Sequence, residues 1–147
     1  MIVVAEGPTR KNVFKEVARI RAQDAGVLLK ERRFLGAIYL LGYSIECYLK
    51  FAVCEQYGWT HLPAKVRLTG HPRDLALYTH DWPDLVDVCG LTAAVRRNPS
   101  TYAIYTNLSD VWGPHLRYRT SVFRAGEAAN LYNNLVELYS FLKEQIP

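Results

Sequence analysis

One stretch of the sequence, residues 36–54, restricts the possible folds more than any other. It reads GAIYLLGYSIECYLKFAVC and is apolar on every helical face except for Glu46 and Lys50. A helix that is apolar all round is buried, either in a bilayer or at the centre of a bundle. Charged side chains near the middle of a bilayer are costly, and Glu four residues before Lys forms a favourable pair on one helical face. We therefore expect the central helix of a soluble bundle and no membrane span.

The composition is that of an ordinary folded chain. Its 147 residues fit one domain, 1–147, that is large enough to bury a core. Half of the residues are hydrophobic, and the net charge of +4 permits a nucleic-acid or nucleotide partner without requiring one. The N-terminal sequence MIVVAEGPTRK lacks the basic segment that opens a signal peptide. Because the 3 cysteines lack CxxC spacing, we expect reduced thiols in the cytoplasm, no metal and no other cofactor.

Apolar residues recur with helical spacing, and no segment alternates strictly at a period of two. The sequence therefore predicts an all-α, up-down bundle of about four to five main helices and no sheet. The predicted helices cover 10–31 capped by Thr9, 34–57 ending near Gly58, 72–80 beginning at Pro72, a short segment through Leu85 and Val88, 91–98, a segment capped by Ser100 and running to about Val111, and 121–146. Residues 59–71 are expected to form a loop.

Two pairs of ionisable residues could carry chemistry. Glu46 and Lys50 are either an ion pair that satisfies itself or a proton donor and acceptor facing a pocket. Arg73 and His80 share one face of the predicted helix 72–80. Such a pair suits a phosphodiester site, in which Arg binds the phosphate and His moves a proton. On spacing alone, a solvated helix face explains Arg73 and His80 better.

The segment from Trp112 to Arg119 reads WGPHLRYR and combines aromatic and basic side chains after a predicted helix. Such a set suits stacking on a base and contact with phosphate. An equally good interpretation is a buried Trp at a turn, with Arg117 bound to a carboxylate such as Glu46. The sequence leaves both open.

The run AIYLLGYSIECYLK, residues 37–50, resembles the second-helix pattern "A-x-Y-L-x-G-Y-x-x-E-x-x-L-K" of the HEPN superfamily of small helical-bundle proteins. Gly70-His71 followed by Asp74-Leu75 is also similar to that family, as is Trp112 followed by Arg117-Tyr118. The resemblance spans residues 10–146. It implies a helical bundle that often forms a homodimer. Many members are metal-independent RNases, often toxins paired with a nucleotidyltransferase-type antitoxin, and others are binding or scaffold proteins.

The catalytic members carry a closely spaced Arg and His on a later helix, where they meet their dimer mates in a cleft. Here Arg97-Asn98 begins in that way, but Pro99 follows and Tyr102 stands where a His could be. The pair formed by Arg73 and His80 has an allowed spacing but lies earlier in the chain. The resemblance therefore favours a member without the RNase chemistry.

Three hypotheses follow from the sequence. The first is a nucleotide- or RNA-interacting module of a toxin–antitoxin or defence-type system. It would place its ligand-binding side chains around one cleft, namely Glu46, Lys50, His71, Arg73, Arg117 and Tyr118. The second is an active endoribonuclease, with Arg73 as phosphate ligand and His80 as general acid and base. The third is a structural partner that docks another protein through a Tyr-rich face.

Overall fold

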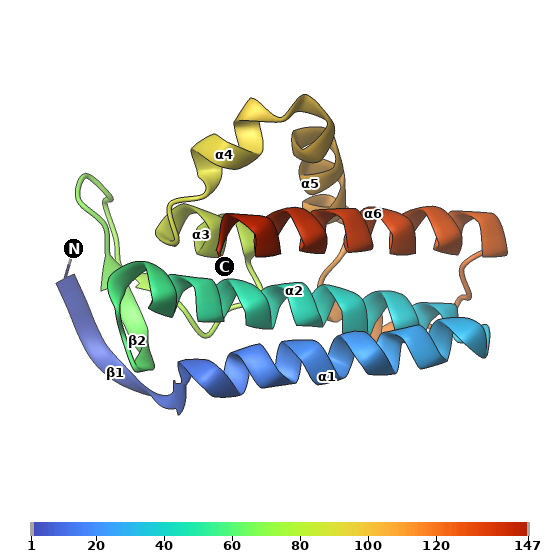
Figure 1. Cartoon of the computed structure of the whole chain (residues 1–147), viewed down its shortest axis with the longest axis horizontal. Coiled ribbons are helices and arrows are strands. Elements are labelled where there is room, and N and C mark those ends of the chain that lie inside the picture. The colour runs from blue at the N-terminus through green and yellow to red at the C-terminus, as the bar shows by residue number, and fades with distance from the viewer. Residues whose placement is uncertain (1, 147) are drawn as a thin grey trace.

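A computed structural model describes residues 2–146 and places most of them in α-helices (Figure 1). Within that range it contains six α-helices, one 3₁₀ helix and three strands. In chain order they are β1 (Ile2–Arg10), α1 (Lys11–Lys30), α2 (Phe34–Tyr57), β2 (His61–Arg67), β3 (Leu75–Ala76), α3 (Trp82–Val88), α4 (Thr92–Arg97), α5 (Pro99–Val111), η1 (Pro114–Tyr118) and α6 (Ala125–Gln145). The predicted helical character is therefore confirmed, and the prediction that no sheet forms is wrong.

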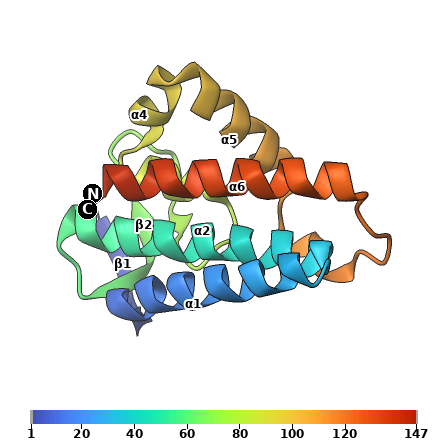
Figure 2. The ribbon, with the colours of Figure 1, turned by 45° about the vertical axis from the view of Figure 1, so that its right-hand side comes forward.

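The three long helices α1, α2 and α6 lie side by side, with α2 in the middle (Figures 1 and 2). A tight turn at residues 31–33 reverses the chain, so α1 and α2 are antiparallel, whereas α6 runs in the same direction as α2. Most of α2 is buried, and the helix ends at Gly58, whose φ of 69° is left-handed. Both the central position and the end of this helix agree with the prediction.

By length and composition, α2 is also apolar enough to cross a membrane. Of its most apolar window, however, 83% is buried inside the protein. Its neighbours are α1, α6, α3, β2 and η1. The apolar surface of α2 is thus covered by other parts of the chain, as in the core helix of a bundle.

The sheet has the order β1-β2-β3 and both pairings are antiparallel. It occupies the predicted loop 59–71 and part of the predicted helix 72–80, so both of those assignments are wrong. Leu75 and Leu77 are buried, whereas Ala76 and Tyr78 between and after them are exposed. This alternation at a period of two is that of a strand with one buried face.

Two predicted helix caps are also corrected. Thr9 lies in β1, where its backbone N–H donates to the Tyr78 hydroxyl over 3.1 Å. Helix α5 begins before Ser100, because the Asn98 side chain accepts a hydrogen bond from the Thr101 backbone N–H over 3.2 Å. Asn is among the best residues at this position, since its short side chain satisfies an N–H that has no partner inside the helix. The last helix starts at 125 and not at 121.

Candidate functional site

The Glu46 carboxylate lies in the middle of α2 and is only 1% exposed. Both of its oxygens have partners. Lys50 Nζ lies 3.0 Å from Oε2, and His80 Nδ1 lies 2.6 Å from Oε1. The predicted pairing of Glu46 with Lys50 is therefore present, and it has a third member. Removing one partner of a buried charge is strongly destabilising, because the charge that remains is left without compensation.

His80 is the solvent-facing member of this cluster, since its side chain is 46% exposed. His80 Nδ1 donates to Glu46 Oε1 in the tautomer that carries the proton on this nitrogen. Nε2 makes no hydrogen bond to any residue between 2 and 146. An imidazole oriented by a carboxylate through one nitrogen, with the other nitrogen free, is suited to proton transfer and to binding a ligand oxygen.

A cavity of about 450 Å³ adjoins His80, between the start of α3, the end of α5 and η1. This volume lies in the range of small-molecule sites. The side chains that line it are polar or aromatic for the most part and belong to His80, Asp81, Trp82, Pro83, Ser109, Asp110, Trp112, Gly113, Pro114 and His115. The Asp81 carboxylate already has one hydrogen-bond partner within the protein, because it accepts a hydrogen bond from the Asp84 backbone N–H over 3.1 Å at the start of α3. His115 gives the cavity a second imidazole.

Two stacked indoles support the cavity wall. The rings of Trp82 and Trp112 are 4.9 Å apart and nearly parallel, and the ring of Tyr39 stacks on Trp112 from α2. The Trp112 indole N–H also donates to the Tyr39 carbonyl over 3.3 Å. A Cβ added at Gly42 would lie 1.9 Å from Trp112 Nε1, so only glycine permits this approach. Tyr39, Gly42 and Glu46 thus occupy one face of α2 and all shape the surroundings of His80.

The structure places His71 and Arg73 away from that cavity. His71 is half-buried, Arg73 is exposed, and both lie near Asp84 in α3. Burial raises the pKa of the Asp84 carboxyl and the charge of Asp81 adds to this, while Arg73 and His71 oppose it. Because residues 72–80 do not form a helix, the predicted shared helix face of Arg73 and His80 does not exist.

Arg117 and Tyr118 are exposed on η1. Arg117 Nε donates to the Pro114 carbonyl over 3.2 Å, and its guanidinium lies 5.6 Å from the centre of the Tyr118 ring. The suggested bond from Arg117 to Glu46 is therefore wrong, and His80 occupies that place. Trp112, by contrast, is 5% exposed, in agreement with a buried Trp at a turn.

The cysteines are poor candidates for nucleophiles. All three are free and buried, and burial raises the pKa of Cys47 to about 11 and that of Cys89 to about 12. A thiol is nucleophilic as its thiolate, which these values suppress at neutral pH. Over residues 2–146, no group of three or more His, Cys, Asp or Glu side chains could hold a metal ion.

Of the six predicted ligand-binding residues, the structure places only Glu46 and Lys50 in the cluster with His80, whereas the other four lie in two separate pairs elsewhere. Sequence reasoning missed Trp82 and Asp110 as neighbours of His80. A usable signal was the order His80-Asp81-Trp82-Pro83, in which an Asp cap and a Pro in the first turn start a helix directly after the histidine. Comparison of the chain with models of protein families, with curated proteins and with solved structures gives no match.

Proposed function

We propose that this chain is a nucleotide- or RNA-interacting module of the HEPN type and that its ligand occupies the cavity beside His80. One observation carries the proposal. A half-exposed imidazole is held through Nδ1 by a buried carboxylate and borders a cavity whose lining includes two stacked indoles. Nucleic-acid sites commonly combine aromatic surfaces with side chains that bind the sugar and phosphate oxygens.

In this proposal Glu46 and Lys50 position His80 and do not touch the ligand, because their side chains are only 1% and 8% exposed. His80 Nε2 accepts a hydrogen bond from a ribose hydroxyl, and His115 supplies a second contact from η1. Arg117 lies on the same short helix and adds positive charge close to the cavity.

The biological setting rests on the resemblance of residues 37–50 to the HEPN pattern. It implies a homodimer in a toxin–antitoxin or defence-type system, beside a nucleotidyltransferase-type partner, and the cysteine pattern adds the expectation of a cytoplasmic setting. The contacts of Tyr39, Gly42 and Glu46 support this, since three of the residues that carry the resemblance surround one candidate site. Light scattering of the purified chain, alone and with such a partner, measures both associations.

The proposal is tested by binding of fluorescein-labelled single-stranded RNA and of adenosine nucleotides, followed by fluorescence anisotropy. His80→Asn keeps a donor near the position of Nδ1 for Glu46 and removes Nε2, so the fold is retained. We expect it to weaken binding about tenfold, the effect of losing one good hydrogen bond. Lys30→Met, at an exposed position outside the cavity, controls for general charge. Equal affinity of the wild type and His80→Asn would overturn the proposed site.

A second candidate function is metal-independent RNA cleavage, which the hydrogen bond between His80 and Glu46 favours. His80 Nε2 would take the proton of the ribose 2′-hydroxyl as that oxygen attacks the adjacent phosphorus, and the bond to the 5′-oxygen would break as that oxygen takes a proton from solvent water. The products are a 2′,3′-cyclic phosphate and a 5′-hydroxyl. Incubation with a mixed RNA pool decides between the two functions. Cyclic ends that disappear in His80→Asn indicate an enzyme, whereas RNA that is bound but stays intact indicates a binding module.

A further inference from the structure

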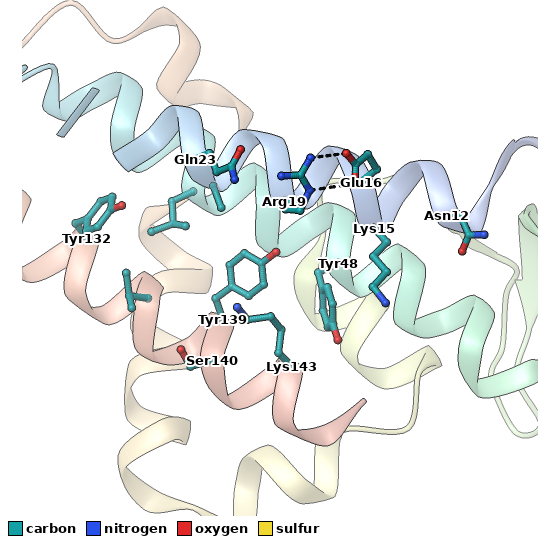
Figure 3. A pocket seen from close by; sticks show the side chains of 13 residues that line it. Asn12, Lys15, Glu16, Arg19, Gln23, Tyr48, Tyr132, Tyr139, Ser140 and Lys143 are labelled. Carbon is teal, nitrogen blue, oxygen red and sulfur yellow. Dashed lines mark hydrogen bonds and ion pairs between the residues drawn. The ribbon is translucent and has the colours of Figure 1, made fainter. Parts of the chain in front are cut away.

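A second and larger cavity, of about 710 Å³, lies between α1 and α6 over the surface of α2 (Figure 3). We call it the α1–α6 groove. Its lining combines tyrosines and aliphatic side chains with basic and amide groups, from Asn12, Lys15, Glu16, Arg19, Ala22, Gln23, Leu41, Tyr48, Tyr132, Val136, Tyr139, Ser140 and Lys143. A cavity of this size with an apolar surface and a few convergent polar groups has the anatomy of a small-molecule site.

The groove is separate from the cavity beside His80. The two share no lining residue. Tyr48 in the groove and Glu46 behind His80 are two positions apart on α2, which is about 200° around a helix. The two cavities therefore lie on opposite sides of α2, and the groove plays no part in the function proposed above.

Two ammonium groups border the groove without a carboxylate partner among residues 2–146. They belong to Lys15 on α1 and Lys143 on α6. Each lies over an aromatic ring, with Lys15 Nζ 5.0 Å from the centre of Phe51 and Lys143 Nζ 4.4 Å from the centre of Tyr139. Arg19, by contrast, is neutralised by Glu16. The groove thus carries uncompensated positive charge on both of its walls.

The side chain of Tyr139 is largely buried, but its hydroxyl opens into the groove and has no partner there. The residue is 7% exposed, and its hydroxyl makes no hydrogen bond within the described chain. The neighbouring Tyr48 hydroxyl, in contrast, donates to the Ile146 carbonyl over 2.6 Å. Burial raises the pKa of Tyr139 to about 12, so at neutral pH its O–H remains a donor. Figure 3 shows this hydroxyl pointing from α6 across the groove toward α1.

We propose that the α1–α6 groove binds a small organic anion with a flat apolar body. The body lies against the tyrosine and aliphatic surface of the groove. Its phosphate or carboxylate head lies between Lys15 and Lys143 and accepts a hydrogen bond from the Tyr139 hydroxyl. Such a ligand supplies what the groove lacks, namely negative charge for two cations without a carboxylate partner and an acceptor for the Tyr139 hydroxyl.

Naphthyl phosphate, naphthoate and uncharged naphthol are suitable probes, with affinities measured by isothermal titration calorimetry. We expect both anions to bind and naphthol to bind about tenfold more weakly, because it lacks the charged acceptor. The order of the two anions identifies the preferred head group. Lys15→Met and Lys143→Met keep most of the apolar stem and remove the charge, so each should weaken anion binding about tenfold. Lys30→Met removes the same charge from an exposed position outside the groove and should leave affinity unchanged.

Tyr139→Phe removes only the hydroxyl and should weaken anion binding severalfold without lowering the melting temperature. Equal affinity for naphthol and the anions would overturn the proposal. So would unchanged anion binding in both lysine variants, or no binding of any probe at millimolar concentration. Loss of RNA binding in His80→Asn with normal probe binding would leave this site intact, because the two cavities are separate.

Discussion

Replacing Gly42 by alanine tests the packing on which the candidate site depends. The added Cβ would lie 1.9 Å from Nε1 of Trp112 and 2.2 Å from its Cε2, so the indole has to move. Trp112 is 5% exposed, stacks on Trp82 and donates a hydrogen bond to the Tyr39 carbonyl. Moving it disturbs all of these contacts at once.

The magnitude of the effect follows from opposing terms. Alanine is about 1 kcal/mol more favourable than glycine inside a helix. Against this, forcing extra volume into a packed core costs about 1–3 kcal/mol, the lost indole hydrogen bond about 1 kcal/mol, and each disturbed aromatic pair about 1 kcal/mol. With two aromatic pairs disturbed, on Trp82 and on Tyr39, we therefore expect Gly42→Ala to lower the free energy of unfolding by about 3–5 kcal/mol.

Urea denaturation followed by circular dichroism and tryptophan fluorescence measures this change. Gly26→Ala is the matched control, since Gly26 is also inside a long helix and its added Cβ would meet only the Tyr132 hydroxyl at 3.9 Å. That variant should gain about 0.5–1 kcal/mol. In a Trp112→Ala background the cost of Gly42→Ala should vanish. Stability at or above the wild type in Gly42→Ala alone, with unchanged fluorescence, would refute the reasoning.

Three further predictions concern other parts of the fold. Asn98→Ala should cost about 1 kcal/mol in urea denaturation by removing the cap of α5, whereas Ser100→Ala should cost almost nothing; equal costs would contradict this capping assignment. Tyr78→Phe should lose about 1 kcal/mol and speed hydrogen exchange at the Thr9 amide, because the hydroxyl joins the backbones of β1 and β2. Burial raises the Cys47 pKa from 9.0 to about 11 in the folded state, so the thiol favours folding below pH 9 and this stability is lost as the pH rises through about 11. Cys47→Ala should therefore show a shallower alkaline loss of stability than the wild type.

The sequence predicted α2 well because local information determines it. Its residues 36–54 are apolar on all faces apart from Glu46 and Lys50, these two pair with each other, and Gly58 ends the helix in a left-handed conformation. The sheet depends on pairing between distant segments, and its strands are difficult to recognise alone. β3 has 2 residues, and β2 contains Pro63, which weakens a strand assignment. Residues 75–78 read LALY, which are all apolar or aromatic, so the sequence does not show the alternation of buried and exposed side chains, and Pro72 favours the start of a helix instead.

Because the sheet is not predicted, the sequence also does not predict that His80 is a partner of Glu46. Helical periodicity places His80 on one face with Arg73, whereas in the structure the fold of the sheet determines where His80 lies. β2 follows α2 after a short turn, β3 pairs back on β2, and the Leu77 N–H donates to the Ala64 carbonyl over 3.0 Å.

The hairpin formed by β2 and β3 therefore folds the chain back and carries His80 to the middle of α2. Glu46 and Lys50 belong to a single helix and need no hairpin to meet. The pairing of Glu46 with Lys50 thus follows from the local sequence, whereas the contact with His80 depends on the tertiary fold. If the cluster served only to stabilise the fold, its charge pairs would be strongest with all three side chains buried, because water weakens the attraction between charges. His80 instead keeps 46% of its side chain exposed at the edge of a cavity. This difference in burial favours a functional role for His80 and a supporting role for Glu46 and Lys50.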